Sequence, residues 1–126
     1  MKILVVEDEP KVVDIIRNHF LRQGHEVFSS ETGQGALELL ERHRPDLMLL
    51  DLWLKDAING LAVLKERQRL SAKTTVIVMT GLEDSSQDEL VSLGAAALMR
   101  KPVRLEELSD LVTHVSANEE EPPREA

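Results

Sequence analysis

The chain has 126 residues, a formal net charge of −8 and no cysteine. This length suits one domain with its own core, and the lack of cysteine excludes disulfides, thiolate metal sites and cysteine nucleophiles. The acidic excess argues against direct binding of nucleic acid, which needs clustered lysines and arginines. No apolar stretch approaches the roughly 20 residues of a membrane span, and the beginning of the chain lacks the layout of a signal peptide. We therefore expect a cytoplasmic domain.

Strand and helix patterns alternate from the beginning of the chain. A β-branched run at 3–6 predicts a first strand, and Pro10 suits the first turn of the helix that follows. Apolar residues recur at spacings of three and four in this helix, which should end before Gly24. The more polar segment 25–29 predicts an edge strand, and a second helix, opened by Thr32, should close at Arg44-Pro45.

The next stretch, 46–51, holds four apolar residues between two aspartates. A continuous apolar run of this length is typical of a central strand in a parallel sheet, where both faces are covered. Open α/β sheets bind ligands beyond the carboxyl ends of their strands. The strand should therefore deliver Asp51 to a functional edge.

The same alternation continues through the second half. We expect a loop at 52–59, a helix at 61–70 and a strand at 75–80. A capping box at 85–88 should begin the next helix, which should end at Gly94. A strand at 95–99, a tight Lys101-Pro102 connection and an amphipathic helix at 105–115 should follow. Residues 118–126 are rich in glutamate and proline, which indicates an acidic tail or linker after a domain at 1–117.

Five strands that alternate with five helices predict a doubly wound α/β fold with a single parallel sheet. Right-handed crossovers bring the carboxyl ends of four strands to one edge. That edge should collect Glu7, Asp8, Asp51, Thr80 and Lys101. Three carboxylates repel one another unless a cation joins them, and oxygen ligands without His or Cys select Mg²⁺ or a similar ion. The hydroxyl and the ammonium are suitable donors to a phosphoryl group under attack by a carboxylate.

With these five groups in this order, residues 2–116 resemble the receiver domain of two-component response regulators, the family of the chemotaxis receivers. The resemblance implies the strand order 2-1-3-4-5 of flavodoxin-like folds. It implies that Asp51 is the phosphoacceptor, that Thr80 is the switch hydroxyl and that Lys101 contacts the phosphoryl group. The implied metal ligands are Glu7, Asp8, Asp51 and the main-chain carbonyl of Trp53. The Lys101-Pro102 pair also matches the family, in which this peptide bond is usually cis.

The resemblance further implies a phosphorelay function. A sensor histidine kinase or a phosphotransfer protein would donate the phosphoryl group, with Mg²⁺ as cofactor. The last two helices and the last strand would then present a changed surface to an output domain or downstream protein. The domain would assist only its own phosphorylation and autodephosphorylation, so we do not expect an enzyme, and a monomer or weak dimer is expected.

Several positions depart from the usual family pattern. Lys55 stands where receivers commonly carry proline, and Gly60 lies nine residues after Asp51 where the family has glycine after eight, so the loop is one residue longer. Leu98 replaces the switch aromatic, and Ala97 the usual acidic neighbour. The coupling of phosphorylation to output is therefore expected to be weak or differently routed.

Trp53 and Leu82 occupy positions that resemble the family's tuning positions for dephosphorylation. Bulky apolar groups there could hinder an attacking water, and a long-lived acyl phosphate is our hypothesis. The alternative for Trp53 is that it covers the core or forms a partner contact.

Three other functions compete with the receiver. A pseudo-receiver, an interaction module that phosphorylation does not switch, is favoured by Leu98 and the altered loop. A small Mg²⁺-dependent phosphatase of another aspartate-nucleophile class would need an acid at Trp53. A dinucleotide-binding half-domain is weaker still, because Gly33 and Gly35 lack a third glycine at the required spacing and do not follow the first strand.

Overall fold

The computed structural model describes residues 1–54, 57–81 and 87–120, the last four of these by their backbone alone. Its elements, in order, are β1 (Lys2–Val6), α1 (Pro10–Arg22), β2 (Glu26–Ser30), α2 (Gly33–His43), β3 (Leu47–Asp51), α3 (Gly60–Leu70), β4 (Thr75–Thr80), α4 (Gln87–Ser92), β5 (Ala95–Arg100) and α5 (Leu105–Glu120). Among the described residues, no helix is both long and apolar enough to cross a bilayer.

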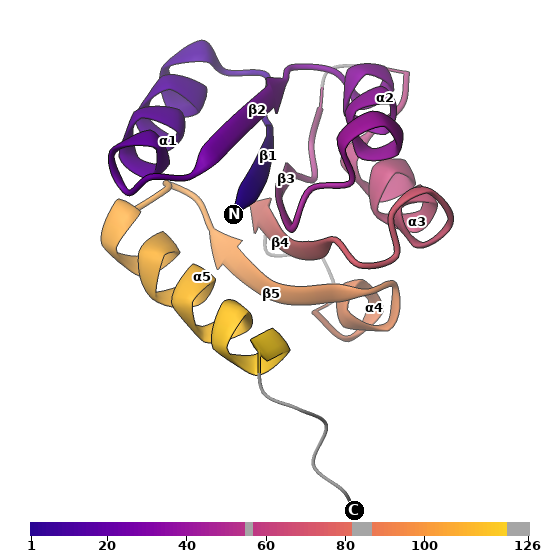
Figure 1. Cartoon of the computed structure of the whole chain (residues 1–126). Helices are drawn as coiled ribbons and strands as arrows, with labels where there is room; N and C mark the ends of the chain where they lie inside the picture. The colour runs from indigo at the N-terminus through magenta and orange to yellow at the C-terminus, as the bar shows by residue number, and fades with distance from the viewer. Residues whose placement is uncertain (55–56, 82–86, 121–126) are drawn as a thin grey trace, which may run out of the picture.

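The five strands form one parallel sheet in the order β2-β1-β3-β4-β5. Helices α1 and α5 cover one face, and α2, α3 and α4 cover the other (Figure 1). The predicted α/β fold and its strand order 2-1-3-4-5 are confirmed. Strand β3 lies in the centre and is buried along its whole length, as expected for a strand covered on both sides.

Each face of the sheet carries its own core. On the α1 and α5 side, Ile16 and Phe20 of α1 pack with Leu108 of α5 against the strands. On the opposite side, Ala36 and Leu40 of α2 pack with residues of α3 and α4. The two cores hold the strand ends in register, so side chains that follow those ends have fixed positions relative to one another.

Two glycines allow the loop after Asp51 to pack closely against the backbone of neighbouring segments. A Cβ at Gly60 would collide with the main-chain oxygen of Asp51 and would lie 2.6 Å from the Cα of Leu52. A Cβ at Gly33 would collide with the carbonyl of Ile58. The longer loop is thus closed by direct backbone contact with the strand end and with the start of α2.

The last helix is longer than the apolar pattern indicated. It extends to Glu120, so residues 118–120, which we assigned to the tail, continue the helix. Glutamate is a good helix former, so Glu119 and Glu120 suit the continuation of the helix. Residues 121–126 lie outside the described part, as do Lys55, Leu82 and the capping-box serines at 85–86.

Candidate functional site

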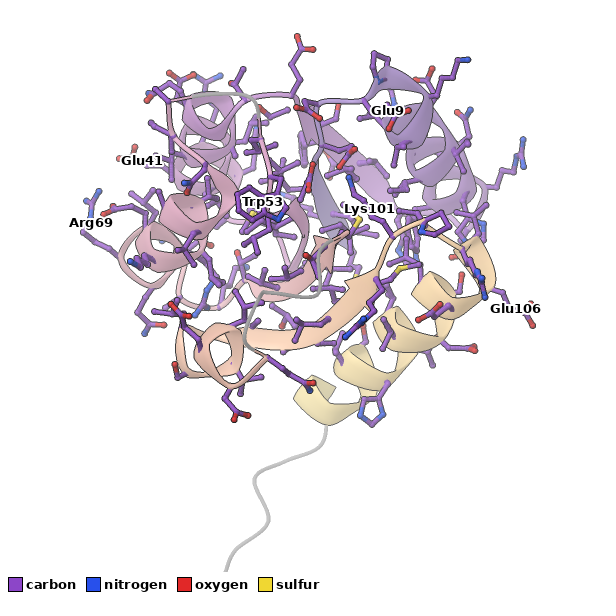
Figure 2. The ribbon with its side chains drawn as sticks, turned by 180° about the vertical axis from the view of Figure 1, so that it is seen from behind. Glu9, Glu41, Trp53, Arg69, Lys101 and Glu106 are labelled. Carbon is purple, nitrogen blue, oxygen red and sulfur yellow. The ribbon has the colours of Figure 1, made fainter. Side chains whose placement is uncertain are left out.

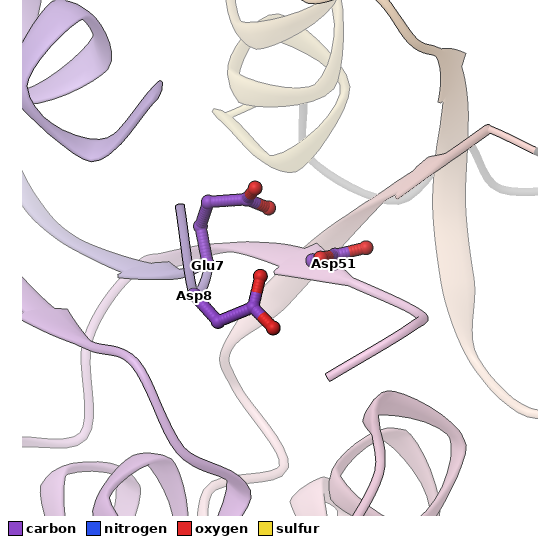
Figure 3. Close-up of side chains that lie close together, drawn as sticks. All are labelled: Glu7, Asp8 and Asp51. Atoms are coloured by element: carbon purple, nitrogen blue, oxygen red, sulfur yellow. The ribbon is translucent and has the colours of Figure 1, made fainter. Parts of the chain in front are cut away.

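Three carboxyl groups meet where β1 and β3 end. Glu7 and Asp8 follow β1, and Asp51 is the last residue of β3. One oxygen from each side chain lies within 4.8 Å of the others, and Figure 3 shows the three groups together. The main-chain N–H of Glu7 donates to the carbonyl of Ser30 at 3.1 Å, which ties the position of Glu7 to the end of β2.

Lys101, which directly follows the edge strand β5, neutralises part of this charge. The Nζ atom of Lys101 lies 3.1 Å from both carboxylate oxygens of Glu7 and 3.3 Å from Oδ2 of Asp51. The main-chain N–H of Lys101 donates to the carbonyl of Thr80 at 2.8 Å, and the peptide bond to Pro102 is cis, as the sequence pattern indicated. The connection after β5 is therefore fixed against the end of β4.

Burial dominates the electrostatics of Glu7, which is 1% exposed. Desolvation raises the pKa of Glu7 from 4.5 to about 7, and the negative charge of Asp51 adds to this, while the hydrogen bonds from Lys101 oppose it. Burial alone would lower the pKa of Lys101, but its hydrogen bond to Glu7 and the attraction of Asp51 outweigh burial and raise it. With all three acids ionised, the cluster and its lysine carry two excess negative charges, which favours a bound cation.

Asp51 has both oxygens engaged and is only 2% exposed. Its Oδ1 accepts the main-chain N–H of Trp53 at 3.1 Å, and its Oδ2 faces Lys101. The first turn of the loop after β3 is therefore hydrogen-bonded to the side-chain carboxylate of Asp51. This bond also keeps the backbone of Trp53 close to the acidic cluster.

The cluster opens into a surface hollow of about 540 Å³. Its lining residues are Glu7, Asp8, Glu9, Pro10, Asp51, Trp53, Gly81 and Lys101. A hollow with an acidic floor and one ammonium can accept a hydrated cation together with a small anionic group. Sequence reasoning did not assign Glu9, Pro10 and Gly81 to the site. Gly81 directly follows β4, and Glu9 and Pro10 come directly after Glu7 and Asp8, so their places in the sequence could have indicated them.

The other candidate residues lie in different surroundings. Thr80, at the end of β4, is buried and is not part of the lining described for the hollow. Leu98 is half-buried and packs against the core that α2, α3 and α4 cover, whereas Ala97 packs against the opposite core. Trp53 belongs to neither core and is 54% exposed, so the interpretation that it covers the core is wrong.

Comparison with known proteins agrees with this architecture. A family model described as the response regulator receiver domain matches residues 3–113. Sporulation initiation phosphotransferase F of Bacillus subtilis is 30% identical over 112 residues, which are 88% of this chain and 90% of that protein. The transcriptional regulatory protein KdpE of Mycobacterium tuberculosis is 29% identical over 105 residues, but the chain spans only 46% of it.

Solved structures give the same result. A receiver domain protein described as CheY-like, from Methanospirillum hungatei, superimposes with a TM-score of 0.85 at 25% identity and covers 94% of this chain and 95% of its own. NtrX from Brucella abortus has a TM-score of 0.85 at 25% identity over 93% of this chain, which spans 27% of that longer protein.

Proposed function

Because the chain belongs to the response regulator receiver domain family of two-component systems, we propose that it accepts a phosphoryl group on Asp51 and thereby switches a partner-binding surface. Receiver domains are signalling domains that interact with histidine kinases or phosphotransfer proteins and with output domains. The observation that carries the proposal is the contact of 3.3 Å between Asp51 and Lys101, beside Glu7 and Asp8 at one strand edge.

In the proposed reaction, a carboxylate oxygen of Asp51 attacks the phosphorus of a phosphohistidine. The P–N bond breaks, its electron pair stays on the imidazole nitrogen, and the phosphoryl group becomes an acyl phosphate. Little covalent help is needed, but the negative charge of the phosphoryl oxygens must be neutralised. The ammonium of Lys101 already lies beside the attacking carboxylate, and this placement supports its role as the phosphoryl-contacting cation.

The family typically binds Mg²⁺, and the residues at the cluster fit that ion. Glu7, Asp8 and Asp51 offer oxygen ligands only, as Mg²⁺ prefers, and the main-chain carbonyl of Trp53 would add a fourth ligand. A bound Mg²⁺ would supply positive charge to the phosphoryl oxygens. Since burial already raises the pKa of Glu7, cation binding at neutral pH would have to displace its proton.

The switch would use the ends of β4 and β5. An acyl phosphate adds about −1.5 to −2 charge, by analogy with other phosphoryl groups, and would attract Lys101 and the hydroxyl of Thr80. Movement there would change the surface formed by α4, β5 and α5, which we assign to an output domain or downstream protein in the cytoplasm. Trp53 and Leu82 would slow hydrolysis of the acyl phosphate by hindering the approach of the attacking water.

A pseudo-receiver is the second candidate, and Leu98 is the observation that favours it. This side chain is half-buried in the core and has neither the ring nor the hydroxyl of the usual switch aromatic. A domain with this residue could keep the fold and bind partners without a phosphorylation-dependent change. The two candidates differ in whether Asp51 takes up a phosphoryl group and whether partner affinity then changes.

The test is to incubate the protein with acetyl phosphate, with Mg²⁺ or with EDTA, and to follow phosphoryl adducts by intact mass. Asp51→Asn is the test variant, and Asp14→Asn, which removes an exposed carboxylate on α1, is the matched control. We expect one adduct that needs Mg²⁺, persists in D14N and is absent in D51N. Absence of an adduct in the folded wild-type protein would refute the proposal and favour the pseudo-receiver.

A further inference from the structure

The side chain of Trp53 differs from the rest of the hollow around Asp51. The other lining residues are carboxylates, one lysine, a glycine and Pro10, so the indole is the only aromatic wall among the residues described there. Of the large apolar side chains that are exposed in the described chain, Trp53 alone lines this hollow. Figure 2 shows it at the same edge of the sheet as Lys101.

The backbone of Trp53 is fixed while its ring remains available. Its main-chain N–H is bonded to Oδ1 of Asp51 at 3.1 Å, two residues from the proposed nucleophile. The side chain takes part in neither core cluster and is 54% exposed. An apolar ring kept in water beside a reactive carboxylate is available to contact the molecule that brings the phosphoryl group.

The geometry of phosphoryl transfer directs the donor's leaving group outward through the hollow, of which this ring forms one wall. The attacking and leaving atoms lie roughly in line on opposite sides of phosphorus. Since Asp51 is 2% exposed, phosphorus can reach its carboxylate only from the hollow, and the leaving group then points outward between the walls of the hollow. For a phosphohistidine this leaving group is a planar, neutral imidazole, which can stack on an indole. For an acyl phosphate it is a small carboxylate, which gains no stacking and meets the negative charge of Asp8 and Glu9.

We propose that Trp53 is a specificity-determining residue whose indole stacks on the imidazole of the phosphodonor and favours aromatic P–N donors over donors without a ring. The inference rests on the proposed function of Asp51. In the step concerned, an Asp51 oxygen forms the new P–O bond as the P–N bond breaks. The electron pair stays on that nitrogen, and the proton already carried by the other ring nitrogen departs with neutral imidazole.

The experiment compares three small donors on the same protein in the presence of Mg²⁺. Phosphoimidazole has the ring, phosphoramidate has a P–N bond without a ring, and acetyl phosphate has neither. Initial rates of adduct formation are measured by intact mass for the wild-type protein, Trp53→Phe, which keeps an aromatic ring, and Trp53→Leu, which keeps apolar bulk. Within each variant the rate with phosphoimidazole is divided by the rate with phosphoramidate, which cancels any effect on metal binding or on Asp51 itself.

A stacked pair of aromatic rings typically changes a rate or an equilibrium by about 2- to 12-fold. We expect this ratio to fall by that factor in W53L and to be largely kept in W53F, with acetyl phosphate following phosphoramidate. An unchanged ratio in W53L, or equal falls in both variants, would overturn the inference. Folding of each variant is checked by its thermal unfolding. If none of the donors phosphorylates the folded wild-type protein, the proposed function of Asp51 fails instead, and the two failures are thus distinguishable.

Discussion

Replacement of Glu7 by glutamine should remove a pH-dependent loss of stability from the metal-free protein. Glu7 is buried beside Asp51, and its pKa rises from 4.5 to about 7 in the folded state. In the unfolded chain the carboxyl loses its proton near pH 4.5, whereas the folded state keeps it up to about pH 7. Stability is therefore lost as the pH rises through this window and stays low above it.

The size of the effect follows from the rise in pKa. At about 1.4 kcal/mol for each pKa unit, the rise corresponds to roughly 3 kcal/mol over the whole window, of which roughly 2–3 kcal/mol falls between about pH 5 and about pH 8. Glutamine has nearly the same shape and can still accept a hydrogen bond from Lys101. The free energy of unfolding of E7Q should therefore vary less with pH, and E7Q should be the more stable protein at about pH 8.

Urea unfolding in EDTA, repeated across this pH range, measures the effect. The control is Glu41→Gln, which neutralises an exposed carboxylate on α2 (Figure 2) and should keep the wild-type pH dependence. Parallel stability curves for wild type and E7Q would refute the reasoning, because they would mean that Glu7 titrates alike in the folded and unfolded states.

Four further results are expected. Addition of Mg²⁺ should change the fluorescence of Trp53, the single tryptophan of the chain, and Asp8→Asn should weaken the apparent affinity at least several-fold, as measured by titration. Trp53→Asn should shorten the lifetime of the acyl phosphate, and an unchanged decay rate followed by intact mass would contradict this. Ile16→Ala should cost about 2–5 kcal/mol of unfolding free energy, whereas Ile15→Ala, on the exposed side of the same helix, should change it by less than about 0.5 kcal/mol in urea unfolding. Gly60→Ala should cost about 1–3 kcal/mol, because its Cβ would meet the backbone of the loop after Asp51, and a wild-type unfolding midpoint would contradict the close packing there.

Much of the fold could be predicted because its local signals agree with the tertiary structure. The apolar run in β3 is buried throughout, and Thr32 accepts a hydrogen bond from the N–H of Gly35 at the start of α2. Boundaries were less certain where polar residues take tertiary roles. Asp46, which we placed in the third strand, instead accepts the main-chain N–H of Lys2 before β3 begins. The apolar period also gave no signal for the last turn of α5, because the sequence after Val115 has no apolar residue at helical spacing.

The site was predictable in its membership and less so in its internal contacts. Strand order places Glu7, Asp51 and Lys101 at one edge, and a sequence pattern is sufficient for that. The hydrogen bonds from Lys101 to Glu7 depend on side-chain conformation and on how deeply the carboxylate is buried. The exposure of Trp53 depends on the path of the lengthened loop, which periodicity does not describe. These properties follow from packing across several elements and required the structure.

The central claim is that Asp51 itself takes up the phosphoryl group. The most direct measurement is to phosphorylate the protein with Mg²⁺ and acetyl phosphate, cleave it, and locate the adduct by tandem mass spectrometry. We predict a modification on Asp51 that neutral hydroxylamine removes, as expected for an acyl phosphate. A stable adduct on a serine, threonine or histidine, or an adduct on a different carboxylate, would contradict the account.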